Sequence, residues 1–157
     1  MSHPLDRPLR LTRLRRVFVH EPLYFVTFCS QARRHLLDRA AVHQTFRQFA
    51  RNALNCGVAV GRHVLMPDHA HLFAQQGRDG LALSVWIKSL RNSLSKTPRE
   101  ERIGPPHWQK GFFDHVMRSA ESYSEKWDYV CNNPARAGLV ERSEDWKYQG
   151  VIHDMAF

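Results

Sequence analysis

Two histidines, His69 and His71, stand two residues apart in the stretch MPDHAHLF, whose other residues are typical of a strand. Residues two apart on a strand point to the same face of a sheet, so both imidazoles can converge on one cation. A histidine pair also leaves coordination positions open for substrate and water. With 10 histidines in 157 residues, chance produces roughly 0.6 pairs at this spacing, so the pair needs support from elsewhere in the chain.

That support comes from SAESYSEKWDYVCNNP, which predicts a helix from about Ser119 to Asn132. Tyr129 falls outside its apolar face, on a stripe with Ser122, Lys126 and Asn133. If the helix reaches Asn133, Tyr129 and Asn133 lie one turn apart. A phenol can act as a nucleophile, and an amide oxygen can be a third metal ligand. Phenols have a pKa near about 10 and are weak nucleophiles at neutral pH. Attack on a phosphodiester would therefore gain from a metal that polarises the phosphate.

The elements that must position these residues can be predicted from hydrophobic periodicity. The predicted order is a strand at 23–30, a helix at 42–53, a hairpin at 58–76, a second helix at 83–94, a strand at 107–117 and the added helix described above. This order predicts an α+β fold of the ferredoxin-like (split βαβ) kind. It has an antiparallel sheet, helices on one face and an added C-terminal catalytic helix. We expect a basic arm at 1–16 and a single domain at 17–157.

The positive charge favours a polyanionic partner such as DNA, RNA or an anionic membrane, with a merely basic soluble protein as the alternative. The composition excludes a disordered chain, and no stretch is long and apolar enough to span a membrane. Formal net charge is +8 and hydrophobic content is 43%. The three cysteines form no CxxC pair, and the N-terminus lacks the apolar run of a secretory signal, so we expect a cytoplasmic protein. Phosphate contacts are expected from basic residues on the arm, on the second helix and near the proposed site: Arg10, Arg13, Arg15, Arg16, Lys88, Arg91, Lys96, Arg118, Lys126 and Arg136.

For some other residues, a structural role competes with a functional one. Trp108, Phe112 and Phe113 could stack on unpaired bases, but their strand spacing favours core packing. His63 has no histidine two residues away and is expected to be structural.

Three segments resemble the single-tyrosine HUH transposases (His, hydrophobic, His), and within them the REP-associated tyrosine transposases of bacteria. The segments are YFVTFCSQARRHLL, HVLMPDHAHLF, and WQKGFFDHVMRS with YVCNNPARAGLV, and they cover most of residues 23 to 148 in the family's order. This chain departs from the family pattern at Asp68, where the family often has asparagine, and at Ala70, where many members have a β-branched residue.

The resemblance implies a role for each matched residue. His69 and His71 would bind Mg²⁺ or Mn²⁺, Asn133 would be the third ligand, and Tyr129 would attack DNA to form a 5′-phosphotyrosine. The implied activity is that of a single-stranded DNA endonuclease and strand transferase that recognises hairpin-forming palindromic DNA and cleaves beside it. The implied location is the bacterial cytoplasm, on the nucleoid. We expect a monomer, with a dimer as the alternative.

Two rival functions stay open from the sequence. One is a DNA- or RNA-binding protein on the same fold that does not cleave, for which the set of two histidines, tyrosine and asparagine would be superfluous. The other is a metal-dependent phosphoesterase that activates water, with Tyr129 as a bystander.

Overall fold

The computed structural model describes residues 21–155, and the arm residues Arg10, Arg13, Arg15 and Arg16 lie outside this range. The described chain forms a five-stranded antiparallel sheet in the order β4-β1-β3-β2-β5. Its strands are β1 (Leu23–Cys29), β2 (Val58–Leu65), β3 (His69–Gln76), β4 (Phe113–Met117) and β5 (Gln149–Val151). The first four strands have the order of a split βαβ fold, so the predicted ferredoxin-like α+β architecture is confirmed.

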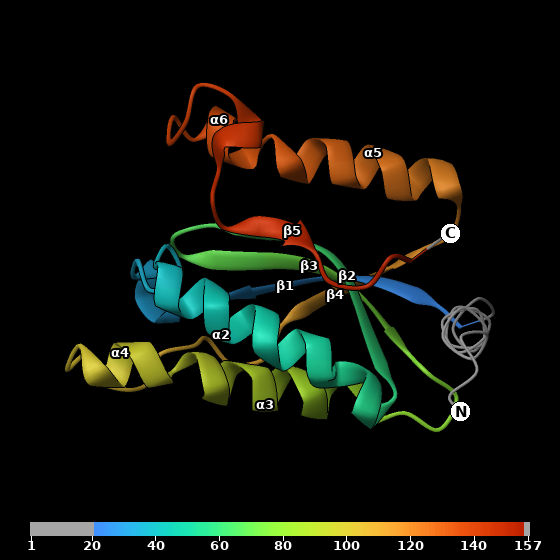
Figure 1. The fold of residues 1–157 in the computed structure, drawn as a ribbon, viewed down its shortest axis with the longest axis horizontal. Coiled ribbons are helices and arrows are strands. Elements are labelled where there is room, and N and C mark those ends of the chain that lie inside the picture. The colour runs from blue at the N-terminus through green and yellow to red at the C-terminus, as the bar shows by residue number, and fades with distance from the viewer. Residues whose placement is uncertain (1–20, 156–157) are drawn as a thin grey trace, which may run out of the picture.

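The helices divide between the two faces of this sheet (Figure 1). The helices α2 (Ala40–Arg51) and α3 (Leu83–Leu94) cover one face, and α5 (Ala120–Cys131) covers the other. Two shorter helices, α4 (Lys96–Glu100) and α6 (Asn133–Arg136), extend α3 and α5, and 3-10 turns occupy Gln31–Arg33, Asn52–Cys56 and Ser143–Asp145. Within the described part of the chain, no helix is long and apolar enough to cross a membrane.

The main core lies between the sheet and the α2/α3 pair. Side chains of alternate strand residues point there, among them Val26, Phe28 and Leu72, and they pack with Phe46 of α2 and Trp86 of α3. The intervening residues point to α5 and form a smaller cluster of Leu23, Phe25, Val64, Met66, Phe73, Met117 and Val130. Val130 is the only buried residue of α5 itself, so this helix covers its face of the sheet more thinly.

The helix α5 starts and ends at identifiable signals. The Ser119 hydroxyl accepts a hydrogen bond from the Ser122 backbone N–H at 3.0 Å, and the Ser122 hydroxyl accepts from the Ser119 N–H at 3.2 Å. At the other end, Pro134 has no N–H to donate to the Val130 carbonyl, which accepts from Asn132 instead. The helix therefore ends at Cys131, and Asn133 begins the separate turn of α6.

The structure differs from the predicted local structure in four places. The last strand begins at Phe113, not at His107, because Trp108 makes an isolated bridge with Ser30 before the chain joins the sheet. The proline- and charge-rich segment 97–106, between the predicted second helix and last strand, was predicted as an irregular connection, but the helix α4 occupies part of it. The strand β5 and the short helix α6 were not predicted at all, because three or four residues carry too little periodicity to be recognised.

Candidate active site

The two histidines of MPDHAHLF lie on the α5 face of the sheet. In the antiparallel register His71 is paired with Thr27 and with Val64, and His69 is paired with Cys29. Ala70, between them, points to the main core. The ring centroids of His69 and His71 are 4.7 Å apart. The expectation that the pair shares one face is therefore confirmed.

The ring of His69 is held by Asp68. Its Nδ1 lies 2.7 Å from Asp68 Oδ1, and Arg33 Nε lies 2.9 Å from Asp68 Oδ2. Partial burial raises the pKa of Asp68, but the hydrogen bond and charge of His69 and the charge of Arg33 outweigh it, and the net pKa is lowered. An ionised carboxylate only accepts hydrogen bonds, so Nδ1 of His69 carries the proton. In the neutral ring the Nε2 lone pair is then available to a ligand.

The ring of His71 is held by different groups. Its Nδ1 lies 2.7 Å from Thr27 Oγ1, and its ring stacks on Phe25 with centroids 5.2 Å apart. Burial, together with the smaller effects of the charges of His69, Lys126 and Arg33, lowers the pKa of His71 to about 3. His71 is thus neutral at physiological pH. If its Nε2 binds a metal, its Nδ1–H donates to Thr27.

The helix α5 carries Lys126 and Tyr129 over this face. It runs antiparallel to β3, because Tyr123 contacts Phe73 at 4.6 Å while Lys126, one turn later, lies 5.3 Å above the Phe25 ring that stacks on His71. One further turn brings Tyr129 toward the His69 end. Figure 1 shows the end of α5 and the β2–β3 turn at the same end of the molecule.

Tyr129 belongs to a small cluster at the α5–α6 junction. Its side chain is 64% exposed, and the Arg136 guanidinium carbon lies 4.0 Å from its ring centroid. Arg136 Nη1 donates to the Tyr129 carbonyl at 2.7 Å, and Nη2 donates to Asn133 Oδ1. The amide oxygen predicted as the third metal ligand is therefore engaged by Arg136. Metal binding by Asn133 would require that hydrogen bond to be exchanged.

The donor set fits a divalent cation that keeps open coordination positions. The part of the chain that the structure describes holds no group of three or more histidine, cysteine, aspartate or glutamate side chains able to bind a metal. The two Nε2 atoms, each freed by an anchored Nδ1, make a two-ligand set that an amide oxygen and substrate oxygens would complete.

The other predicted DNA contacts are spread over both layers. Arg118 is exposed directly after β4, and Lys126 adjoins the histidines. Lys88 is exposed on α3, across the sheet from His71. Arg91 Nη1 donates to the carbonyls of Gln109 and Gly111 at 3.0 and 2.6 Å, and burial lowers its pKa. Arg91 thus holds the segment that leads into β4.

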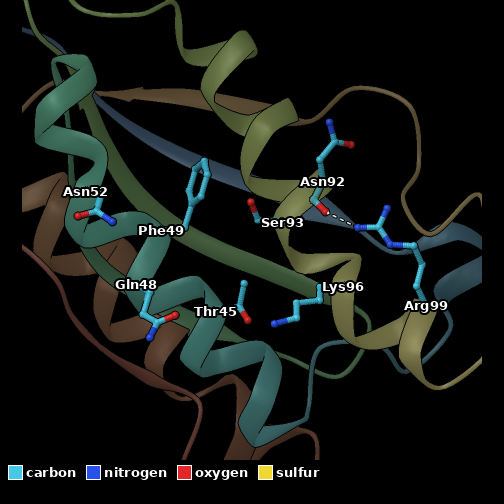
Figure 2. A pocket seen from close by; sticks show the side chains of 8 residues that line it. All are labelled: Thr45, Gln48, Phe49, Asn52, Asn92, Ser93, Lys96 and Arg99. Atoms are coloured by element: carbon cyan, nitrogen blue, oxygen red, sulfur yellow. Dashed lines mark hydrogen bonds between the residues drawn. The ribbon is translucent and has the colours of Figure 1, made fainter.

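A groove of about 620 Å³ lies between α2 and α3, on the layer opposite the histidines. Its lining is polar apart from Phe49 and comprises Thr45, Gln48, Phe49, Asn52, Asn92, Ser93, Lys96 and Arg99. Figure 2 shows the Lys96 side chain directed toward Thr45, while Arg99 Nη2 donates to the Asn92 carbonyl at 3.3 Å. None of these residues contributes to the histidine site.

Sequence reasoning missed the groups that orient the histidines. Thr27 is 44 residues from His71, and only the strand register reveals that they are neighbours. Asp68 was noticed as a departure from the family pattern, and the structure shows it bound to His69 rather than unpaired.

The sheet carries the His-hydrophobic-His pair on one face, and the helix that covers this face carries Tyr129, as the resemblance to the HUH transposases predicts. No family model matches the chain. A Haemophilus influenzae protein, provisionally named a REP-associated tyrosine transposase, is 27% identical over 162 residues, which is 92% of this chain and 88% of that protein. The REP-associated tyrosine transposase of Escherichia coli is 26% identical over 95 residues, 59% of this chain and 54% of that protein.

Solved structures show the same fold. The structure of a REP-associated tyrosine transposase bound to a REP hairpin matches with a TM-score of 0.67 at 19% identity, over 84% of this chain and 78% of that one. A Deinococcus radiodurans protein, provisionally described as a transposase, matches with a TM-score of 0.51 at 16% identity, over 73% of this chain and 92% of that one. The resemblance to REP-associated tyrosine transposases is therefore confirmed in both sequence and fold.

Proposed function

We propose that this protein is a metal-dependent single-stranded DNA endonuclease and strand transferase that recognises hairpin-forming palindromic DNA and cleaves beside it through Tyr129. The observation that carries the proposal is the anchoring of both histidines through Nδ1, by Asp68 and by Thr27. This leaves the two Nε2 atoms as the free ends of neighbouring rings, on the sheet face that is covered by the helix bearing the tyrosine. A pair of histidines with only a structural role does not require both rings to be held through Nδ1 with both Nε2 atoms left for a ligand.

The chemistry is a transesterification. The Tyr129 phenolic oxygen attacks the scissile phosphorus, and the bond from phosphorus to the 3′ oxygen breaks. The 5′ phosphate becomes attached to tyrosine, and the leaving strand ends in a 3′ hydroxyl, which gains the proton that the phenol loses. Because the ester energy is kept in the phosphotyrosine, a 3′ hydroxyl can reverse the step and join a strand. This reversibility supplies strand transfer without another energy source.

The residues around the site have separate tasks in this proposal. His69 and His71 would hold Mg²⁺ or Mn²⁺ through Nε2, with Asn133 as the third ligand once its oxygen turns from Arg136. A bound divalent cation would polarise the phosphate and reduce the cost of charge at the transition state. Lys126 and Arg136 place positive charge beside His71 and Tyr129, where a phosphate of the substrate would lie.

Three features support action on DNA as a monomer. The net charge of +8 favours a polyanion, and the REP-hairpin complex of the structural neighbour offers a precedent for hairpin DNA. The contact of Tyr123 with Phe73 seats α5 on the sheet of its own chain, so the tyrosine and the histidines can act together without a partner.

The test uses DNA hairpins with single-stranded flanks, drawn from a pool with randomised loops and flanks, and Mg²⁺ or Mn²⁺. We expect a protein–DNA adduct that survives denaturing electrophoresis and disappears in Tyr129→Phe. Tyr148→Phe is a matched control, because Tyr148 packs edge-on against His43 and Trp146 away from the site, and its adduct should persist. Cleavage by Tyr129→Phe would favour the water-activating phosphoesterase, and hairpin binding without cleavage would favour the binding protein.

A further inference from the structure

Phe113 occupies an unusual place for a phenylalanine. Its side chain is 73% exposed at the start of β4, an edge strand of the sheet. The two aromatic residues near it in sequence have structural tasks. Trp108 Nε1 donates to the Arg91 carbonyl and to Ser95 Oγ, both at 2.9 Å, and Phe112 packs partly against the main core. The prediction that all three aromatics pack in the core is therefore wrong for Phe113.

The strand register places Phe113 on the face of the histidines. Phe113 is paired with Thr27, and Thr27 is paired with His71. Directly paired residues of antiparallel strands project to the same face, so the three side chains form one row across the sheet. Two strand spacings separate β4 from β3, on the order of 10 Å. That span is about three nucleotides at a stacked rise of 3.4 Å, and fewer in an extended strand.

The helix α5 leaves this edge of the face open. Its aromatic residues Tyr123 and Trp127 sit over Phe73 of β3, and Lys126 reaches only as far as Phe25 of β1. The β4 residues Phe113 and His115, which share the face, are both exposed. The open strip therefore begins beside the anchored histidines and ends at the aromatic ring of Phe113.

The charges beside this strip suit a nucleic-acid backbone. Lys126 Nζ lies 5.3 Å from the centroid of the Phe25 ring that stacks on His71. Arg33 pairs with Asp68, the carboxylate that holds His69. Arg118 is exposed directly after β4. A strand with a phosphate at the histidines would lie among cations, and its next bases would reach an exposed ring. Stacking on an aromatic ring accepts any base, since each base has a π-face.

We propose that Phe113 stacks on one unpaired base of the single strand, within about three nucleotides of the phosphate bound at His69 and His71. This inference rests on the proposed function, because it takes single-stranded DNA as the occupant. It assigns the β4 edge as the side on which the single strand passes the site. The hairpin itself does not contact Phe113.

The test measures binding in the Tyr129→Phe background, so that cleavage does not deplete the complex. The probe is the tightest-binding hairpin of the randomised pool, with its flanks intact. We expect Phe113→Leu to weaken binding by about 5- to 150-fold, the loss that one base–aromatic stack predicts, and Phe113→Trp to retain it. The same hairpin without flanks should bind both proteins equally. Val151→Ala is the matched control, since Val151 is 56% exposed on the opposite edge strand, β5, and should bind like the parent.

A second arm identifies the stacked base. Abasic sites are introduced one at a time in the flanks, leaving the sugar–phosphate backbone intact. At one position the abasic site should weaken binding to the parent as much as Phe113→Leu does, with no further loss when the two are combined. Additive losses at every position, or unchanged affinity in Phe113→Leu, would overturn the proposal.

Two further outcomes separate this inference from its alternatives. A change from dimer to monomer in Phe113→Leu, seen by light scattering with DNA affinity unchanged, would assign the ring to a contact between two copies and refute the stacking. If the parent forms no covalent adduct yet Phe113→Leu loses flank binding, the proposed cleavage fails while the stacking stands. A thermal midpoint equal to the parent's shows that Phe113→Leu is folded.

Discussion

Two pairs of histidines lie on opposite faces of the sheet, and they are held in opposite ways. His69 and His71 are anchored at Nδ1 by Asp68 and Thr27, which leaves both Nε2 atoms to the α5 side. His63 of β2 and His43 of α2 meet Nε2 to Nε2 at 3.0 Å inside the main core. In the core pair, the two Nε2 atoms bind each other. In the pair of His69 and His71, the Nε2 atoms take no part in the bonds that hold the rings.

The two pairs therefore differ in which ring nitrogen is anchored, and this difference, more than sequence spacing, separates the proposed metal-binding pair from the core pair. A β-bulge between Val60 and His63 turns Arg62 toward α5 and His63 toward α2. His43 and His63 are 20 residues apart and were not predicted to meet, although His63 was predicted to be structural, and its side chain is buried. Burial and the charge of Arg47 lower the pKa of His43 to about 4, so it is neutral at physiological pH.

Substituting one histidine of each pair should have the largest effects and should separate the roles of the two pairs. We expect His71→Gln to reduce adduct formation by at least about 100-fold, because metal polarisation supplies several kcal/mol. Its fold should persist. We expect His63→Leu to leave His43 Nε2 unpaired in the core and to lower the free energy of unfolding by about 1–3 kcal/mol.

Denaturant titration and quantification of the adduct per folded molecule separate the two effects. His63→Leu should form adduct at the parent's rate when folded, and His71→Gln should unfold near the parent's midpoint. The opposite pattern, with His63→Leu inactive although folded, would remove the distinction between the pairs.

The sequence predicted those parts of the molecule that depend on local periodicity. Four strands and three helices follow from apolar spacing, and the shared face of His69 and His71 follows from alternation along one strand. Register between distant segments has no local signal, so the bond from Thr27 to His71 and the exposure of Phe113 on an edge strand became visible only in the folded chain.

The α5–α6 junction shows how one backbone detail limits a prediction. The single stripe predicted for Tyr129 and Asn133 required a continuous helix, and Pro134 interrupts it. The side chain of Arg136 connects the two residues instead, through the ring of Tyr129 and the amide oxygen of Asn133. The sequence placed Arg136 near the site but contained no indication of this bridge.

The groups that hold the proposed metal-binding pair, Thr27 and Asp68, offer a test with an effect of intermediate size. Thr27→Val removes the acceptor that fixes the tautomer of His71, and Asp68→Asn removes the charge that fixes His69. Groups that orient metal ligands typically change metal affinity or activity by about 10- to 100-fold. We therefore expect each variant to need a correspondingly higher Mn²⁺ concentration for half-maximal adduct formation.

The matched control for Thr27→Val is Thr45→Val. Thr45 makes an ordinary side-chain bond to the Ala41 carbonyl at 3.0 Å on α2, across the sheet from the site. Its Mn²⁺ dependence should equal the parent's. If Thr27→Val and Thr45→Val share the same half-maximal Mn²⁺ concentration, Thr27 does not orient a ligand.

The pair of His43 and His63 should make the stability of the protein depend on pH in mildly acidic solution. Burial lowers the pKa of His63 to about 3, and that of its partner falls to about 4, whereas unfolded histidine titrates near about 6.5. The unfolded chain therefore binds more protons over this interval, so the stability present above about pH 6.5 is lost as pH falls toward the folded-state pKa values.

Replacing both rings in His43→Leu/His63→Leu keeps the core apolar and removes both titrations. We expect the free energy of unfolding of the parent to fall by roughly 1–3 kcal/mol more than that of the double variant between pH 6.5 and 5, measured by denaturant titration at each pH. If the free energies of unfolding of the parent and of the double variant change equally with pH, His43 and His63 have the same pKa values in the folded and unfolded chains, and burial does not keep the pair neutral.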